Sequence, residues 1–417
     1  MKARLDSGAT TLAAGSILVT AFFVALAACS ASGDAPSTVP AEDGGSVLPS
    51  GDDTPDDGAP DDAGPDVTDA AQPLCSVDGF CHTSVPEGKD LISVWGDGEG
   101  LVWAVSYSGD VLCWDGAKWA LRHRTGVLTY AIWGSGPTDL WIGTETGLVH
   151  GHGASPAALV FEPIDAPGDP TIAIKSIWGT GPDDVWAVGG AEHLDLVPSV
   201  TKGRVLHLAR TDAGSAWTSQ EDLASTKIAF RSVWGSAKTG VWIQGVRPDD
   251  EPDGSSTNFP HAHVLRRPTA ATTWTSVALP RAPQGTTGTP FASHIFGANT
   301  IADTSVWLAG ILGVLDRGSW RGTSTDGGES FTWTFTGGTR WDRMPFAYWG
   351  TAPDDTWAVG ETGLVSHWDG TTWKQAIIRT SSVPITKHLR AVWGKDSSDF
   401  WIVGHETALH RIGTGKP

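Results

Sequence analysis

Residues 176–190 read SIWGTGPDDVWAVGG, and this phrase recurs along the chain. Each copy has a short apolar run that ends in Trp-Gly, a turn rich in Gly, Pro and Asp, and a second apolar run. In most copies the Trp of the second run follows the Trp of the first by eight residues. Two β-strands joined by a tight turn give this pattern, and such self-similarity is the signature of a repeat architecture. The phrase therefore predicts a structural unit that the chain repeats.

Seven copies of the unit are visible. Six keep the spacing of eight, with the pairs Trp95 and Trp103, Trp133 and Trp141, Trp178 and Trp186, Trp234 and Trp242, Trp349 and Trp357, and Trp393 and Trp401. The fifth copy is degenerate, because Phe296 replaces the first Trp and Trp307 follows eleven residues later. A buried aromatic side chain of this size removes about 150–250 Å² from water. We therefore interpret these aromatic residues as packing contacts between units rather than as a ligand site.

The composition suits an all-β domain with many turns. Among 417 residues there are 52 Gly, 26 Pro and 22 Trp but only 3 Tyr, which favours short strands around a large core. The formal net charge of -19 argues against nucleic acid as a partner, because like charges repel. The sequence contains no Gly-rich phosphate loop and no nucleophile elbow. We expect no cofactor, no catalytic residue and a monomer.

Each unit is predicted to hold four strands. In the sixth unit they are residues 347–349, 356–359, 364–368 and 372–376. Asp369-Gly370 between the last two is a hairpin signal, because a type I′ turn needs positive φ. Four-stranded antiparallel units repeated around an axis are the blades of a β-propeller, and residues 79–417 divide into seven units of about 48 residues, a length typical of blades. The predicted fold is an all-β, seven-bladed β-propeller over residues 75–417.

The last unit lacks a fourth strand. Its third strand, residues 408–412, is followed by only five more residues. The segment 79–85, which precedes the first unit, is predicted to pair with that strand and complete the blade. Closing the ring in this way removes the exposed edges that an open sheet must protect.

An Asp stands two residues before the second Trp in four units, at Asp139, Asp184, Asp355 and Asp399. Asp side chains are favoured in turns because the carboxylate accepts hydrogen bonds from nearby groups of the turn. We predict that these acids cap the turn between the first and second strands and are not catalytic.

Residues 1–28 have the basic start and short apolar stretch of a signal peptide. They lead into LAAC at residues 26–29, which resembles the lipobox of bacterial lipoproteins. The resemblance implies that residues 1–28 are removed and that Cys29 is diacylated. In lipoproteins of this kind, Asp after the lipidated Cys marks retention at the inner membrane, and this chain has Ser30 there. The resemblance therefore implies an outer-membrane lipoprotein that faces the periplasm or the cell exterior. The alternative is an ordinary signal peptide cleaved after an Ala-x-Ala site.

Residues 29–74 are predicted to form a disordered, extended tether. The segment is dominated by Ala, Gly, Pro, Ser, Thr and Asp, and it has eleven acidic residues without Lys or Arg. Such a composition cannot bury a core, and its charges repel one another. Its Asp-Asp pairs leave calcium binding as an alternative, although the alternation and Gly of an EF-hand loop are missing. Cys75 and Cys81 follow, and an oxidising compartment predicts a disulfide between them.

The repeat resembles the Trp-Gly and Trp-Ala-Val-Gly repeats of propellers in bacterial surface lipoproteins, and more distantly the Asp-box (BNR) propellers. Residues 324–331, STDGGESF, match the Asp-box pattern at Ser324, Asp326 and Gly328. In that family the box is a turn between the third and fourth strands. The resemblance therefore implies that Asp326 binds local backbone amides and is not a catalyst.

A sialidase-like glycoside hydrolase is the enzymatic alternative that this resemblance raises. Family sites need an arginine cluster, a Tyr/Glu pair and an acid on neighbouring blades. Arg343-Met344-Pro345 resembles the family's Arg-Ile-Pro phrase, but here it follows the box, whereas the family places it before the boxes. Few Tyr are available, and Tyr348 abuts the repeat Trp349. We expect a protein that is not an enzyme.

Function is expected where the units differ, because loops on a rigid scaffold carry specificity. In a propeller, the connections from second to third strand and from fourth to first strand share one face. The long insertions fall on that face, at 190–203 and 246–260 in units three and four, and at 280–290 and 337–345 around unit five. We hypothesise that these four loops form a recognition surface for a protein or a glycan.

The candidate ligand-binding residues are Asp195, Arg247, Asp249, Asp250, Glu251, His261, His263, Trp341 and Arg343. The alternative is that the loops are merely tolerated, since surface loops accept extra length at small cost. The His261–His263 pair with nearby acids leaves metal binding open, but no metal is assigned, because such pairs at strand edges are usually polar surface. A structural envelope or pilus-associated component is the other functional alternative.

Overall fold

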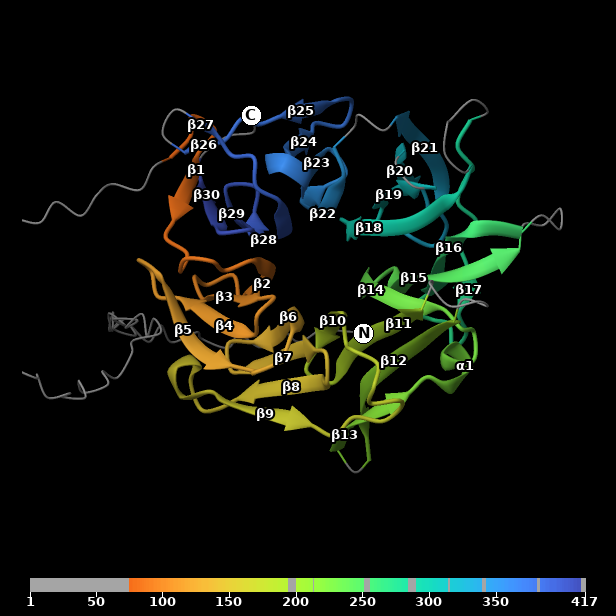
Figure 1. Cartoon of the computed structure of the whole chain (residues 1–417), viewed down its shortest axis with the longest axis horizontal. Helices are drawn as coiled ribbons and strands as arrows, with labels where there is room; N and C mark the ends of the chain where they lie inside the picture. The colour runs from red at the N-terminus through yellow and green to blue at the C-terminus, as the bar shows by residue number, and fades with distance from the viewer. Residues whose placement is uncertain are drawn as a thin grey trace, which may run out of the picture.

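The computed structural model describes residues 75–193, 200–212, 214–250, 256–283, 290–313, 316–339, 343–380 and 383–413. In these residues, seven four-stranded antiparallel sheets follow one another around a ring (Figure 1). The first strands of successive sheets contact each other all the way round, and β28 (Leu389–Asp396) of the last contacts β2 (Leu91–Gly96) of the first. The chain is a seven-bladed β-propeller, which confirms the predicted fold class.

Blades one to four each use four consecutive strands. In blade one, β2 is followed by β3 (Val102–Ser106), β4 (Asp110–Trp114) and β5 (Trp119–Arg124). Blade two holds β6 (Thr129–Gly136), β7 (Asp139–Thr144), β8 (Gly147–His152) and β9 (Val160–Ile164). Blade three holds β10 (Ser176–Gly181), β11 (Asp184–His193), β12 (Val200–Thr211) and β13 (Gly214–Ser219). Blade four holds β14 (Ala229–Ser236), β15 (Gly240–Asp250), β16 (Ser256–Arg267) and β17 (Thr275–Ser276).

Blades five to seven complete the ring. Blade five holds β18 (Ala292–Ile301), β19 (Ser305–Leu312), β20 (Asp316–Thr323) and β21 (Thr332–Thr339). Blade six holds β22 (Pro345–Ala352), β23 (Asp355–Gly360), β24 (Val365–Trp368) and β25 (Trp373–Gln375). Blade seven holds β28, β29 (Asp399–Gly404), β30 (Thr407–Ile412) and β1 (Phe80–Thr83). Outside the blades lie the β26 (Arg379–Thr380) and β27 (Val383–Pro384) pair and the short helices η1 (Pro156–Ala158), α1 (Glu221–Ala224) and η2 (Glu361–Gly363). Within the described ranges, no helix combines the length and the hydropathy that a membrane crossing requires.

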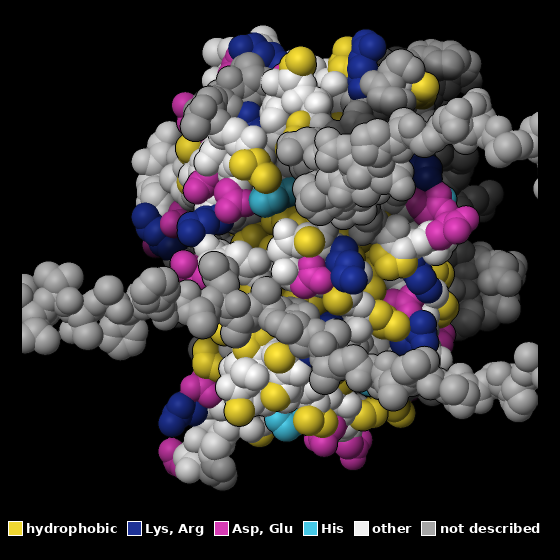
Figure 2. Space-filling model, turned by 90° about the vertical axis from the view of Figure 1, so that its left-hand side faces the viewer, with side chains coloured by type: hydrophobic (Ala, Val, Ile, Leu, Met, Phe, Trp, Pro, Cys, Tyr) yellow, Lys and Arg dark blue, Asp and Glu magenta, His cyan; other side chains and the backbone are white. Residues whose placement is uncertain are grey.

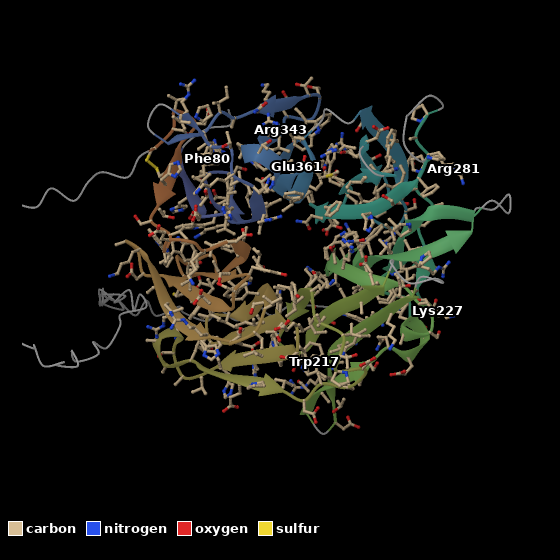
Figure 3. All side chains as sticks on the ribbon, in the orientation of Figure 1. Phe80, Trp217, Lys227, Arg281, Arg343 and Glu361 are labelled. Carbon is tan, nitrogen blue, oxygen red and sulfur yellow. A yellow bond between two sulfur atoms is a disulfide. The ribbon has the colours of Figure 1, made fainter. Side chains whose placement is uncertain are left out.

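The N-terminal strand β1 is the fourth strand of blade seven. It pairs antiparallel with β30, and Phe80 stands opposite Arg411. The Phe80 side chain (Figure 3) is fully buried in the core of that blade. A disulfide joins Cys75, which precedes β1, to Cys81, the second residue of β1, and so closes a small loop at the start of the propeller.

The repeated Trp-Gly pair explains how neighbouring blades fit together. A Cβ atom added to Gly96 would lie 2.4 Å from the ring of Trp393 in the preceding blade, and one added to Gly134 would lie 2.8 Å from the ring of Trp95. A larger side chain at either glycine would therefore overpack the boundary. The same contact joins Trp133 with Gly179, Trp178 with Gly235, and Trp349 with Gly394.

Blade five departs from the predicted pattern. Trp307 pairs across the strands with Asn299, which stands eight residues earlier, and not with Phe296. Asn299 therefore takes the place of the first Trp. Phe296 lies in a β-bulge with 36% of its surface exposed, so its assignment as a structural repeat residue is wrong. The spacing is a better guide than the similarity of Phe-Gly to Trp-Gly, because cross-strand pairing fixes the distance along the chain.

A histidine on the third strand binds each of the four repeated turn acids. The His Nε2 to Asp Oδ1 distances are 2.6 to 2.8 Å in the pairs His150–Asp139, His207–Asp184, His367–Asp355 and His410–Asp399. Each His ring also lies over the second Trp of its blade, with centroids 3.8 to 4.6 Å apart. The blades that lack the Asp lack the His as well, and they carry Cys113, Arg266 and Arg321 in its place. This His–Asp contact belongs to the scaffold, because it recurs at one place in four blades.

Two of the predicted loops are largely strand. β11 extends to His193, and β12 begins at Val200. In blade four, β15 and β16 remain paired from Trp242 opposite Arg266 as far as Asp250 opposite Ser256, so the blade carries a long two-stranded arm. The Gly, Pro and Asp residues near its tip favour a loop by composition, but pairing along the arm satisfies the backbone donors and acceptors that a loop leaves to water.

Candidate functional site

A cavity of about 470 Å³ opens at the centre of the ring, on the face of the second-to-third and fourth-to-first connections. Its volume lies within the range of small-molecule sites, about 300–1,000 Å³. Six blades contribute to it, and the lining residues are Asp90, Ile92, Tyr107, Tyr130, Lys175, Phe296, Phe346 and Arg390. We call it the central cavity.

Most of these residues occupy one repeated place, three residues before the first Trp of the phrase, or before Asn299 in blade five. We call this place the ring position, and its residues are Ile92, Tyr130, Lys175, Arg231, Phe296, Phe346 and Arg390. In six blades the cross-strand pairing skips the ring residue, which makes it part of a β-bulge. Lys175 of blade three directly precedes β10. Bulges redirect side chains, and ring residues of different size and charge line the central cavity from six of the seven blades.

Aromatic rings form much of the cavity wall. Tyr107 and Tyr130 meet edge to face with centroids 5.8 Å apart, and Phe296 and Phe346 lie 6.2 Å apart. Tyr107 is 44% exposed although it is large and partly apolar. Exposed rings gathered in one concave place are typical of ligand sites, because a soluble surface seldom keeps them together without a partner.

Lys175 and Arg390 bring positive charge to the same cavity. Arg390 Nη2 lies 3.5 Å from Asp90 Oδ2, and its guanidinium lies over the ring of Phe346. Within the described part of the chain, the Lys175 ammonium has no hydrogen bond or ion pair. Burial and the nearby Arg231 lower the pKa of Lys175, while the Glu192 carboxylate opposes that shift.

A partly buried ion pair lies beside Lys175. Arg231 donates from Nε and Nη2 to the two carboxylate oxygens of Glu192 at 2.8 and 2.7 Å, and His294 Nε2 lies 3.9 Å from the same carboxylate. Burial alone would raise the pKa of Glu192, but His294, Arg231 and the charge of Lys175 outweigh it and hold the pKa at about 2. Glu192 is therefore an acceptor of hydrogen bonds and not a general acid, which needs a pKa near the working pH.

A second cavity of about 450 Å³ lies between blades five and six, and Arg343 is part of its wall. Figure 3 shows Arg343 and Glu361 close to each other on blade six. Arg317 of blade five binds Glu361 at 3.0 Å, and burial raises the pKa of the Tyr348 phenol, which lines the same cavity. Arg343, one of the predicted candidates, is thus placed in the wall of a cavity.

The remaining candidates lie elsewhere or outside the described residues. Arg247 and His261 face each other across the arm of blade four, and the His261 ring stacks on Phe291 at 3.6 Å. His263 stands opposite Gly245 on the same arm, and Asp249 and Asp250 belong to β15. Asp195, Glu251, Trp341 and the lipidation residue Cys29 lie outside the described residues. The arm residues and Arg343 therefore belong to different parts of the face.

The Asp box forms a turn between β20 and β21. The Ser330 amide donates to Asp326 Oδ1 at 3.0 Å, and the Gly328 amide donates to Ser324 Oγ at 2.7 Å. Hydrogen bonds from the Ser330 hydroxyl, the Ser330 amide and the Ser324 hydroxyl to the carboxylate lower the pKa of Asp326. Gly328 has a φ of +97°, a conformation that favours glycine. Among the residues described, no group of three or more His, Cys, Asp or Glu side chains is placed to hold a metal ion.

The sequence contains a signal for the ring position, which lies inside the repeated phrase and outside the variable loops. The place three residues before the repeated Trp holds Ile, Tyr, Lys, Arg, Phe, Phe and Arg in turn, whereas the flanking positions hold small or aliphatic residues in most blades. Variation at one place inside a repeated phrase is what a site on a rigid scaffold produces. The bulge that exposes the ring residue is not visible in the sequence, because regular alternation assigns side chains to faces by parity.

No protein-family model matches the chain, and no curated protein sequence matches it. Solved β-propellers do. YCF48 bound to D1 peptide aligns with a TM-score of 0.54 and 14% identity, over 82% of this chain and 99% of the other. Virginiamycin B lyase from Staphylococcus aureus aligns with a TM-score of 0.53 and 13% identity, over 79% of this chain and 98% of the lyase. The extracellular domain of BT4673 from B. thetaiotaomicron aligns with a TM-score of 0.55 and 13% identity, over 82% of this chain and 40% of the other. These likenesses establish the fold class, a β-propeller.

Proposed function

We propose that the chain is a lipid-anchored, extracytoplasmic propeller that serves as a binding or scaffolding module. Its ligand, a protein or a glycan, docks on the face that carries the second-to-third and fourth-to-first connections. The observation that carries the proposal is the ring position: six of the seven blades repeat the Trp-Gly scaffold, and six of the seven ring residues, which differ in size and charge, line the central cavity. A repeated scaffold with a varied centre is the arrangement expected of a recognition site.

The structural relatives support a binding role in general terms. YCF48 has been solved with a peptide bound, and the BT4673 relative is an extracellular domain. Virginiamycin B lyase is an enzyme with the same fold. We favour binding over hydrolysis, because the cavity carboxylate Asp90 and the neighbouring Glu192 both lie beside an arginine. Neither is poised as the free acid or base that a glycosidase needs.

Lipid anchoring is supported by the sequence alone. The LAAC motif at residues 26–29 and the acidic segment that ends at residue 74 match a diacylated Cys29 followed by a spacer. We expect the wild-type protein to enter the detergent phase of a Triton X-114 extraction, and Cys29→Ala to remain in the aqueous phase. Equal partitioning of the two proteins, with no added mass on the wild-type N-terminus, would contradict the anchor.

The binding proposal is tested with immobilised envelope extract from the source bacterium. One portion is treated with protease and another with periodate, which separates protein from glycan ligands. We compare the full-length chain in detergent with a variant whose arm, residues 247–260, is replaced by a two-residue turn, and with a Tyr130→Ala, Phe346→Ala variant. Asp369→Ala, in a turn of the opposite face, is the matched control. Unchanged binding of both site variants would refute the proposed face.

A further inference from the structure

The central cavity differs in charge from the chain as a whole. The formal net charge is -19, yet the ring position holds three cations and no acid. Two of the cations have carboxylate neighbours: Arg231 binds Glu192, and Arg390 lies near Asp90. The third, Lys175, lies near the Glu192 carboxylate that Arg231 already binds, and it has no direct hydrogen bond or ion pair of its own among the described residues. With histidines neutral, these three cations and the carboxylates of Asp90 and Glu192 sum to one positive charge, while the Glu145 carboxylate acts on Tyr130 from outside this group. Lys175 is the cation of the group without a direct ion pair.

An ammonium in this position favours a carboxylate ligand. Lys175 is half-buried, and withdrawing a charge from water is unfavourable unless a counter-charge and hydrogen-bond acceptors replace the water. A ligand carboxylate supplies both, and hydrogen bonds between ionised partners are about twice as strong as neutral ones. Charge complementarity of this kind also speeds association with an anion.

The cavity walls determine the remainder of the ligand. Tyr107, Tyr130, Phe296 and Phe346 offer flat rings, which pack against an apolar face and, in the tyrosines, also offer a hydroxyl. Asp90 contributes a carboxylate to the same wall, so the ligand has to bring hydrogen-bond donors there. An ammonium without a direct ion pair, flat walls and a carboxylate acceptor together describe an anionic ligand with a flat body and several neutral donors.

We propose that the central cavity binds a carboxylated sugar, a pyranose with one carboxylate and free hydroxyls; this inference rests on the proposed binding function. The carboxylate binds Lys175, hydroxyls donate to Asp90, and the C–H face of the sugar packs on Phe296 and Phe346. An unsubstituted aromatic acid such as benzoate brings no donors for Asp90. A zwitterionic amino acid brings no net negative charge to balance Lys175.

Isothermal titration calorimetry on the full-length chain in detergent tests the inference with D-glucuronate. D-glucose keeps the hydroxyls without the charge, benzoate keeps the charge and a flat ring without hydroxyls, and L-phenylalanine is the zwitterion. Methyl β-D-glucuronide has a blocked anomeric oxygen, as in a polysaccharide, so it distinguishes a chain-terminal residue from a free sugar acid. Lys175→Met removes the charge, and Lys118→Met, an exposed residue near a turn of the opposite face, is its matched control.

We expect glucuronate or its methyl glycoside to bind the wild type and Lys118→Met equally, and Lys175→Met roughly 10- to 100-fold more weakly, the effect of losing one charge-assisted hydrogen bond. Glucose, which lacks the carboxylate, should bind the wild type more weakly than glucuronate by a similar factor. Lys175→Arg keeps the charge and should retain binding. The comparison of glucuronate with glucose uses only the wild type, so it remains valid if Lys175→Met does not fold.

Three results would overturn the inference. These are equal binding of glucuronate to the wild type and a folded Lys175→Met, binding of benzoate or phenylalanine at least as tight as that of the sugar acids, and no binding of either sugar acid. If the sugar acids fail while binding to envelope extract still requires Tyr130 and Phe346, the ligand class is wrong and the proposed function stands. If both experiments fail, the proposed function falls with the inference.

Discussion

Asp355 is the turn acid whose loss should destabilise the propeller most. Its carboxylate is 1% exposed and accepts hydrogen bonds from His367 Nε2 at 2.8 Å and from the hydroxyls of Thr351 and Ser397. Ser397 belongs to blade seven, so this carboxylate also joins two blades. A hydrogen bond to a charged group contributes about 1.5–3 kcal/mol, and these three share one acceptor, so we expect Asp355→Ala to cost about 4 kcal/mol.

The same motif provides matched controls at increasing exposure. The side chain of Asp139 is 26% exposed and that of Asp399 is 50% exposed, and each binds its own His at 2.6 or 2.7 Å. Solvent replaces lost partners more easily at exposed sites and screens the charge. We expect Asp399→Ala to cost about 1 kcal/mol and Asp139→Ala an intermediate amount.

Scanning calorimetry of the three variants measures these differences. An unfolding entropy of about 2.1 cal/mol/K per residue, over roughly 320 residues, converts 4 kcal/mol into a fall of about 6 °C in Tm for Asp355→Ala and less than 2 °C for Asp399→Ala. Circular dichroism checks that each variant is folded before heating. Equal falls in the two variants, or a larger fall for Asp399→Ala, would refute the argument that burial sets the strength of this contact.

Three further predictions concern the scaffold. Gly96→Ala should lower the free energy of unfolding by about 1–3 kcal/mol, because the new Cβ meets the Trp393 ring. Gly136→Ala is the control and should leave that free energy unchanged, because no atom lies within 4 Å of its Cβ. Equal unfolding midpoints of the two variants in denaturant would argue against the blade-packing role. The pKa of Glu192 lies at about 2 instead of its ordinary 4.5, so its stabilising effect is complete above pH 4.5 and is lost as the pH falls toward 2; melting temperatures between pH 6 and 2 should fall less steeply in Glu192→Gln, and parallel curves would contradict the ion pair. Replacing Cys75 and Cys81 together by Ser should cost about 2 kcal/mol, because the disulfide restricts the unfolded chain; a reductant should then destabilise the wild type to a similar extent, and a wild type unaffected by reduction would show that the loop contributes nothing.

The fold is predictable from the sequence because its main determinant is local. Trp178 and Trp186 are eight residues apart because a tight turn brings them opposite each other, and the Gly after each first-strand Trp leaves room for the Trp of the preceding blade in five boundaries. Blade five is the exception. There Asn299 keeps the spacing but not the residue type, so a search for aromatic residues selects Phe296 instead.

The candidate site is less predictable, because it depends on where bulges fall. Phe346 and Arg390 reach the cavity as extra residues in a ladder, and alternation alone does not place a side chain at a bulge. The arm of blade four shows the converse. Its composition favours a loop, but Arg247 and His261 are cross-strand partners, and such long-range pairing leaves no mark in a short window of sequence.

The position of the disulfide has a mechanical consequence for the proposed N-terminal lipid anchor. Force applied through the preceding chain enters the propeller at Cys75 and passes across the disulfide to Cys81 within β1. The load therefore bypasses the short loop between them and falls on the pairing of β1 with β30. The oxidised protein should resist extension as one unit until that pairing shears, whereas the reduced protein should first yield by the length of the loop.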